Sequence, residues 1–298
     1  MKIVTFQVEK KQKLGILNAD EQWVYPIECF GMEYKEMQEA VEEMSESEIQ
    51  LLNHVAKKDP YEVPGAARIS EVKLLAPIQK PKQDIICLGI NYMAHAEESA
   101  RFKKEEFNGE RPYAVYFSKR VNQATGDGDG IPRHADVVQG LDYEVELAVI
   151  LKKDAYRVSK EDAKDYIFGY TIINDVSARD VQTRHNQWYF GKSLDGYVPM
   201  GPCITSFDEI TYPPKLAIRS YVNGELRQNS NTELLIFDID HVISELSQAM
   251  TLQAGTIISM GTPAGVGMGF NPPKYLQVGD EVVCEVEGIG RISNTVVE

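Results

Sequence analysis

The chain has 298 residues, 43% of them hydrophobic, and its 45 Asp and Glu outnumber its 31 Lys and Arg to give a formal net charge of −14. This composition excludes disordered and fibrous classes, and without a cationic cluster it argues against a nucleic-acid partner. No apolar run approaches the roughly 20 residues that cross a bilayer, and the opening MKIVTFQVEK lacks the order of a signal peptide, so we expect a cytoplasmic protein without a membrane partner.

The first part of the chain predicts a small α+β unit. Three short alternating segments, residues 3–8, 13–18 and 22–25, are expected to form strands. Two segments with helical spacing follow, residues 32–44 and 48–57, and Ser47 with Gln50 suggests a capping box for the second. Asp59-Pro60 and Pro64-Gly65 interrupt this pattern. We therefore expect an N-terminal domain over residues 1–70 and a larger domain over 71–298.

The larger domain is expected to consist mainly of strands, so the fold class is mixed α/β and β-dominated. Apolar runs predict strands at residues 84–88, 113–117, 143–151, 167–174, 217–222, 256–260 and 281–286. Helices are expected at residues 91–102, 159–165 and 238–250. Asn223-Gly224 predicts a tight hairpin, because both residues tolerate positive φ.

Three carboxylates form a candidate metal site. Glu144 and Glu146 lie two residues apart on a predicted strand, so their side chains share one face. An exposed strand face would explain this pair, but the apolar run after it favours burial, where carboxylates need a cation. Asp175 ends another apolar run and is either a helix cap or a third ligand. Together these residues predict an all-oxygen site for Mg²⁺ or Mn²⁺, whereas zinc is disfavoured because no His or Cys ligands are paired.

Two further motifs are candidates for a catalytic role. His95 and Glu98 are three residues apart on a predicted helix, which fits either a surface pair or a general base whose imidazole is oriented by a carboxylate. Lys192 stands in a Gly-Lys-Ser sequence, but the upstream glycine of a phosphate-binding loop is replaced by Asn186. The glycine-rich stretches at 126–130 and 265–269 are interpreted as turns or loops, because neither has the flanking residues of a calcium or dinucleotide site.

Read together, several motifs make the chain resemble the fumarylacetoacetate hydrolase family. In order they are Gly89-x-Asn-Tyr-x-x-His-x-x-Glu98, Phe117-x-Lys119, Asp142-Tyr-Glu-x-Glu-Leu147, Asn174-Asp-x-Ser-Ala-Arg-Asp-x-Gln182, Gly191-Lys-Ser-x-Asp195, Asn223-Gly224 and Gly261-Thr-Pro-Ala-Gly-Val-Gly267. The resemblance implies a mixed β-sandwich roll for the larger domain, a divalent metal and a homodimer. One departure is Arg120, which stands where the family usually has proline and puts the path of the loop over 119–130 in doubt.

The resemblance also implies roles for individual residues. Glu144, Glu146 and Asp175 match metal ligands, and His95 and Glu98 match a water-activating pair. Lys192 is expected to take part in catalysis as a cationic donor. The residues expected to bind the substrate are Arg179, Gln182, Thr262 and Lys119.

The function that follows is cleavage of a C–C bond in a short 2,4-dioxo acid, such as an acylpyruvate or a fumarylacetoacetate-type acid, through a metal-stabilised enolate. His95 would activate the water in this hydrolysis. The same scaffold supports oxaloacetate decarboxylation or isomerisation of a 2-hydroxyhepta-2,4-diene-1,7-dioate, and both stay open as alternatives. A catalytically silent scaffold protein is the non-enzyme alternative, which the complete set of polar motifs disfavours. The expected partner is therefore a small 2-oxo or 2,4-dioxo acid.

Overall fold

The structure, a computed structural model, describes residues 1–107 and 109–298. Its strands are β1 (Lys2–Val8), β2 (Lys11–Leu17), β3 (Trp23–Pro26), β4 (Ala67–Arg68), β5 (Lys73–Leu75), β6 (Ile85–Gly89), β7 (Val115–Lys119), β8 (Gly130–Pro132), β9 (Leu141–Asp142), β10 (Val145–Leu151), β11 (Ile167–Asn174), β12 (Ser177–Ala178), β13 (Met200–Ser206), β14 (Ala217–Val222), β15 (Glu225–Asn231), β16 (Ile257–Ser259), β17 (Glu281–Val286) and β18 (Gly290–Val297). Its α-helices are α1 (Met37–Glu43), α2 (Glu46–Val55), α3 (Met93–Lys103), α4 (Arg179–Arg184), α5 (Tyr189–Lys192) and α6 (Ile239–Ser247). The fold is thus β-dominated mixed α/β, as expected.

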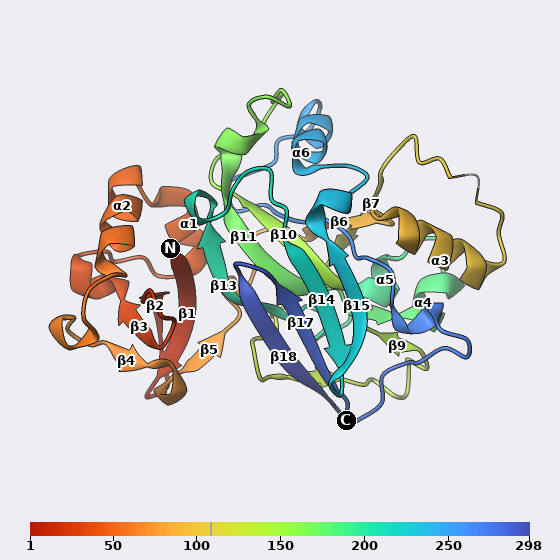
Figure 1. Cartoon of the computed structure of the whole chain (residues 1–298), viewed down its shortest axis with the longest axis horizontal. Coiled ribbons are helices and arrows are strands. Elements are labelled where there is room, and N and C mark those ends of the chain that lie inside the picture. The colour runs from red at the N-terminus through yellow and green to blue at the C-terminus, as the bar shows by residue number, and fades with distance from the viewer. Residues whose placement is uncertain (108) are drawn as a thin grey trace.

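The strands of the described residues form two large sheets and a small one. The largest sheet has the order β4-β3-β2-β1-β13-β11-β10-β16-β6-β7, with β5 also paired to β1, and the second has the order β15-β14-β17-β18-β8. Figure 1 shows β14, β17 and β18 lying across β10 and β11, so the two sheets pack face to face. The apolar side chains between them, including Leu147, Val149 and Ile218, form the main core.

Strand β10 determines the position of the candidate site. All of its residues are buried, because it is covered on both faces, and it pairs antiparallel with β11 in a register that places Val145 opposite Asn174. The backbone N–H of Asp175 donates to the carbonyl of Glu144 over 2.8 Å. This register brings the segment before β10 beside the segment after β11, where the predicted carboxylates lie.

The N-terminal strands belong to the same sheet as β10 and β11. β1 pairs antiparallel with β13, with Ile3 opposite Ile204. A second apolar cluster contains Ile3 and Met37 from the N-terminal segment and Ala148 and Ile150 from β10. The division into domains at residue 70 therefore stays a prediction, and the hydrogen bonds of the sheet continue across it.

Two expectations about the N-terminal helices were wrong in detail. The first helix begins at Met37 and not at residue 32. The second begins after Ser45, whose hydroxyl accepts from the N–H of Glu48, while the Glu48 carboxylate accepts from the N–H of Ser45. The capping box is therefore formed by Ser45 and Glu48, two residues before the position that we predicted.

In the larger part of the chain, most strand predictions are confirmed and one helix prediction is wrong. Residues 159–165 form no α-helix: the Ser159 hydroxyl accepts from the N–H of Asp162, and a short 3-10 turn follows over Ala163–Tyr166. The hairpin is confirmed, because Asn223 and Gly224 have φ values of 51° and 78°. Strands β13 and β18 were not predicted. Within the described ranges, no helix combines the length and hydrophobicity that crossing a membrane requires.

Candidate active site

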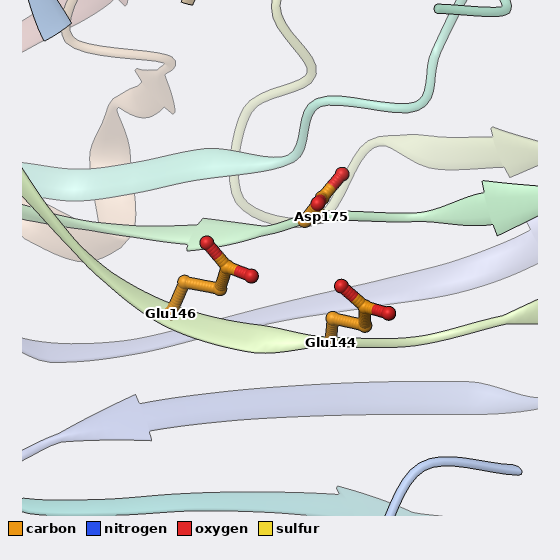
Figure 2. Close-up of side chains that lie close together, drawn as sticks. All are labelled: Glu144, Glu146 and Asp175. Carbon is orange, nitrogen blue, oxygen red and sulfur yellow. The ribbon is translucent and has the colours of Figure 1, made fainter. Parts of the chain in front are cut away.

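Three buried carboxylates meet where β10 and β11 pair. Glu144 directly precedes β10, Glu146 is its second residue, and Asp175 directly follows β11. One carboxylate oxygen of each lies within 4.8 Å of the others. Figure 2 shows the two glutamates projecting to the same side of one strand, with Asp175 on the neighbouring one. Asp175 does not cap α4, whose N-cap position is Ala178.

Cations surround two of the three carboxylates. Lys192 Nζ lies 2.8 Å from Glu144 Oε2 and 2.6 Å from Asp175 Oδ2, and Arg179 Nη2 lies 2.6 Å from Glu144 Oε1. Burial alone would raise the pKa of Glu144, but the charges of Lys192 and Arg179 outweigh it and hold that pKa below its usual value. Glu144 is therefore a carboxylate ion.

Glu146 lies in a different electrostatic environment. Its Oε2 accepts from the Ser259 hydroxyl at 2.6 Å and from the Gly261 N–H at 3.0 Å, yet no lysine or arginine of residues 1–107 and 109–298 forms an ion pair with it. Burial, followed by the charges of Asp175 and Glu144, raises its pKa well above the usual value. The lysines and the arginine of the site thus pair with Glu144 and Asp175, and within the described residues none of them pairs with Glu146.

The donor set fits a hard divalent cation. Three carboxylates supply only oxygen ligands, and the uncompensated charge at Glu146 is the kind of site that a cation neutralises. Oxygen ligands suit Mg²⁺ and Mn²⁺ better than they suit zinc or copper. Glu144, Glu146 and Asp175 are therefore the residues that would hold the metal.

The His95–Glu98 pair is buried on α3. His95 Nδ1 lies 2.9 Å from Glu98 Oε2, and the two residues are only 4% and 6% exposed, so a pair on the protein surface is excluded. The other Glu98 oxygen accepts from the Gly265 N–H at 3.0 Å. With Glu98 ionised, the proton of the neutral imidazole sits on Nδ1, and Nε2 is left as the basic nitrogen.

Asn91 anchors the start of α3 to the segment before α6 and to the residue that follows β16. Its side-chain amide donates to the carbonyls of Phe237 and Met260, and its oxygen accepts from the N–H of Phe237. Ile90 just before it has a φ of 57°, which is strained for a β-branched residue. The anchor therefore holds a strained turn that directs His95 towards the carboxylates.

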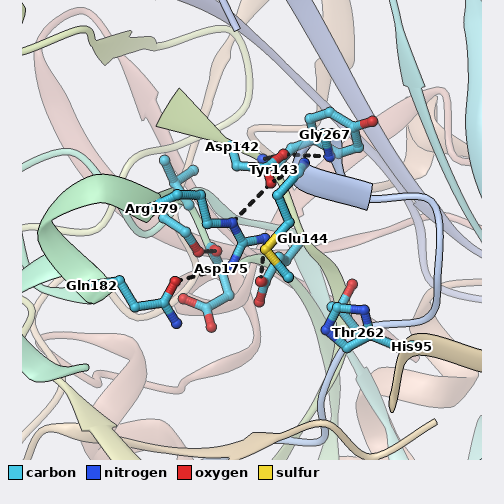
Figure 3. A network of polar contacts seen from close by, with 12 residues as sticks. His95, Asp142, Tyr143, Glu144, Asp175, Arg179, Gln182, Thr262 and Gly267 are labelled. Atoms are coloured by element: carbon cyan, nitrogen blue, oxygen red, sulfur yellow. Dashed lines mark hydrogen bonds and ion pairs between the residues drawn. The ribbon is translucent and has the colours of Figure 1, made fainter. Parts of the chain in front are cut away.

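One cavity brings most of the predicted residues together. Of the residues that the sequence singled out, those that line it are His95, Glu144, Glu146, Arg179, Gln182, Lys192 and Thr262. Phe117 and Trp188 form an aromatic wall with ring centroids 5.4 Å apart, and α3 adds Ser99 and Lys103. Figure 3 shows His95 and Thr262 lying on one side of Glu144, with Arg179 and Gln182 on the other.

Lys119 is the predicted substrate-binding residue that the structure does not bring to this cavity. Its side chain has no exposed surface, and its Nζ lies 2.5 Å from Asp175 Oδ1 and 2.7 Å from the Val176 carbonyl. Among the described residues, Lys119 therefore forms a buried ion pair with Asp175 and does not line the cavity. The Arg120 N–H, next in the chain, donates to Ser193 Oγ at 3.1 Å, so this loop is tied to the segment after Lys192.

Several residues at the site were not predicted. Asp142 accepts from Arg179 Nε, and Gln228 donates to the Thr262 hydroxyl at 2.7 Å and to the Pro263 carbonyl. Asp142 could have been found, because it stands two residues before Glu144 in the Asp-Tyr-Glu motif. Gln228 follows a hairpin far from the other motifs, so no local signal identified it.

The fold and the site together define a β-dominated enzyme whose buried carboxylates and oriented histidine share one cavity. The family described as Fumarylacetoacetate (FAA) hydrolase C-terminal matches residues 84–297. The chain belongs to this family, whose members are enzymes that act on carbon–carbon bonds.

Individual relatives differ in the reactions for which they are named. Oxaloacetate tautomerase YisK of Bacillus subtilis (strain 168) is 48% identical over 228 residues, which cover 76% of this chain and 74% of that protein. A fumarylacetoacetate hydrolase structure from psychrophilic Exiguobacterium antarcticum is 37% identical with a TM-score of 0.83, covering 100% of this chain and 99% of the other. A maleylpyruvate hydrolase from Sphingobium sp. SYK-6, in complex with manganese(II) and pyruvate, is 28% identical with a TM-score of 0.75, covering 100% and 99%.

Proposed function

We propose that the protein is a metal-dependent enzyme that interconverts the enol and keto forms of a short 2-oxo dicarboxylic acid, with oxaloacetate as the first substrate to test. The observation that carries this proposal is the cavity that Glu144 and Glu146 of the buried carboxylate cluster line together with the oriented base His95. The oxaloacetate tautomerase relative, at 48% identity, supports the choice of substrate.

The chain's own cations fit an anionic substrate. Arg179 and Lys192 line the cavity and supply hydrogen-bond donors for the 1-carboxylate and the 2-oxo oxygen, while Gln182 and Thr262 offer neutral polar contacts. When bound to Glu144, Glu146 and Asp175, Mg²⁺ or Mn²⁺ would supply positive charge near the oxygen on which negative charge develops. These local charges compensate the repulsion expected from a protein with a net charge of −14.

The proton transfer is assigned to His95. In the direction from enol to keto, the hydroxyl at C2 gives its proton to solvent and C3 gains one from His95. His95 Nε2, protonated from solvent, would deliver the proton to C3, and in the reverse direction the neutral imidazole would remove it. Glu98 keeps Nδ1 protonated throughout and stabilises the imidazolium while it exists.

Helix α3 supplies a cation that suits the second carboxylate of a dicarboxylate substrate. His95, Ser99 and Lys103 are four residues apart in turn, so they lie along one helical face, and all three line the cavity. Lysine side chains on a helix lean towards its N-terminus, which directs the Lys103 ammonium back along this face. We assign Lys103 to the distal carboxylate.

Hydrolysis of a C–C bond in an acylpyruvate is the second candidate. It is favoured by the same His95–Glu98 pair, which suits activation of water as well as proton transfer to carbon, and by the fumarylacetoacetate hydrolase structure that covers the whole chain. Decarboxylation of oxaloacetate and isomerisation of longer dienoates are the further reactions that this scaffold supports. The homodimer and the cytoplasmic location stay predictions.

The experiment is to follow the ultraviolet absorbance of the oxaloacetate enol while measuring pyruvate release from oxaloacetate and acetylpyruvate in parallel. Each assay contains Mg²⁺, Mn²⁺ or EDTA and is compared with a metal-only blank. Metal-dependent loss of enol without pyruvate, abolished in His95→Ala, supports the tautomerase. Pyruvate from acetylpyruvate would make the protein a hydrolase, and pyruvate from oxaloacetate alone would make it a decarboxylase.

A further inference from the structure

We propose that Asp142 is a positioning residue that holds Arg179 and the loop over residues 265–269 as one unit. This inference rests on the proposed function, because it concerns how the cavity binds a carboxylate substrate. Asp142 has no exposed surface and is not among the described residues that line the cavity or form the carboxylate cluster. Its effect on the substrate must therefore pass through its neighbours.

Both oxygens of Asp142 are fully used by contacts inside the protein. Oδ1 accepts from the N–H groups of Tyr143 at 2.9 Å and Gly267 at 2.7 Å. Oδ2 accepts from the Met268 N–H at 3.0 Å and from Arg179 Nε at 2.8 Å. Figure 3 shows Asp142 between Gly267 and the Arg179 guanidinium. A carboxylate with four donors is a rigid junction.

The contact with Arg179 selects how its guanidinium faces the cavity. With Nε held by Asp142, Nη2 reaches Glu144 Oε1 at 2.6 Å and Nη1 donates to Gln182 Oε1 at 3.1 Å. A guanidinium is a planar fork, so fixing one edge fixes the direction of the other. Without Asp142, the Arg179 guanidinium would be free to rotate and donate two N–H groups to Glu144. This contact would occupy a candidate metal ligand and remove the donors from the substrate.

The contacts with the loop connect Asp142 to the His95–Glu98 pair. Gly267 and Met268 donate to Asp142, and Gly265 in the same loop donates to Glu98 Oε1 at 3.0 Å. The loop approaches Asp142 so closely that a Cβ at position 267 would lie 2.6 Å from its Oδ1. One buried carboxylate therefore sets the position of the group that grips the substrate and of the loop that orients the base.

The alternative is that Asp142 only satisfies buried N–H groups and stabilises the fold. A double-mutant cycle separates the two roles. The readout is the dissociation constant of oxalate, a planar probe for the 1-carboxylate and 2-oxo group, measured by calorimetry on the Mn²⁺-loaded protein. We expect Asp142→Asn to weaken oxalate binding at least about tenfold in the wild-type background, but less than about twofold when Arg179→Met is already present. Melting temperatures report whether each variant is folded.

A second variant keeps the test decisive if Asp142→Asn does not fold. Arg179→Lys retains the positive charge but removes the Nε–H that Asp142 holds, so we expect it to bind oxalate as weakly as Arg179→Met. Equal effects of Asp142→Asn in both backgrounds, or wild-type affinity in Arg179→Lys, would overturn the inference while leaving the proposed function intact. A Mn²⁺-loaded wild-type protein that neither binds oxalate nor converts oxaloacetate would overturn both.

Discussion

Gly269 lies directly against the carboxylate of Glu98: a Cβ atom at position 269 would stand 2.0 Å from Glu98 Oε1. Gly269 has no left-handed backbone, so Gly269→Ala acts through this contact and not through strain in φ. We expect Glu98 to be pushed away from His95 and kcat to fall at least about tenfold, and by no more than the ~10²–10⁴-fold that a general base contributes. If the contact is the cause, Gly269→Ala combined with Glu98→Ala has the same rate as Glu98→Ala alone.

The carboxylate cluster predicts that a single substitution weakens metal binding. Glu146→Gln keeps the size of the side chain and its contact with Ser259 but removes the negative charge that no lysine or arginine of the described residues balances. We expect Mn²⁺ affinity to fall by at least about tenfold, measured by calorimetry without substrate. Glu281→Gln, on the surface end of β17, is the matched control and leaves the affinity unchanged. Equal affinity in Glu146→Gln and wild type would remove Glu146 from the metal site.

The same residue predicts a pH dependence of stability. Burial, with the charges of Asp175 and Glu144, raises the pKa of Glu146 in the folded protein, whereas the unfolded chain titrates near ~4.3. The folded state therefore binds more protons than the unfolded state, and this group's contribution to stability falls as pH rises through its folded pKa. In EDTA, the melting temperature of wild type relative to Glu146→Gln should decrease as pH rises above ~4.3. A difference that is constant with pH would contradict the raised pKa.

The position of Lys103 predicts that the protein discriminates between substrates with and without a distal carboxylate. Lys103→Ala removes the cation that α3 adds to the cavity. We expect KM for oxaloacetate to rise about tenfold, because a charge-assisted contact is lost. KM for acetylpyruvate should change less than about twofold. Arg101→Ala, an exposed charge on the same helix that does not line the cavity, is the control. An equal rise for both substrates would mean that Lys103 does not contact the distal carboxylate.

The buried position of Lys119 predicts that its replacement lowers stability without removing a contact to the substrate. Among the described residues, Lys119→Met leaves Asp175 with Lys192 as its one lysine partner and leaves the Val176 carbonyl without the Lys119 donor. Breaking a buried ion pair from one side costs about 3–5 kcal/mol. We expect a loss of this size in the free energy of unfolding, to be measured with urea in EDTA. Lys73→Met, which breaks the more exposed pair with Asp129, is the comparison and should cost no more than about 1 kcal/mol. Similar losses in the two variants would refute a structural role for Lys119.

The parts of the site that could be predicted from the sequence are those in which spacing along one segment determines geometry. The two-residue spacing of Glu144 and Glu146 and the three-residue spacing of His95 and Glu98 each place both side chains on one face of an element. The register of β10 against β11, which brings Asp175 to the two glutamates, depends on hydrogen bonds between distant segments. The resemblance to a family, and not the spacing, joined these motifs into one site.

The missed elements have physical reasons as well. Strand β13 contains Gly201 and Pro202, which normally indicate a turn, and β18 has polar residues on much of its length. Both are strands because of their partners in the sheets. Conversely, residues 159–165 have helical spacing, but the contact between the Ser159 hydroxyl and the Asp162 N–H is followed only by a 3-10 turn over Ala163–Tyr166. Tertiary pairing overrode local preference in β13 and β18.

The pairing of β1 with β13 limits how the N-terminal segment can be exchanged between relatives. β13 has β11 on one edge and β1 on the other, so removing residues 1–70 would uncover a row of backbone N–H and carbonyl groups in the middle of the protein. An uncovered edge of this kind invites pairing with another chain. A chimera built at this junction therefore needs a donor segment that supplies an edge strand in the same register as β1, whatever the rest of that segment does.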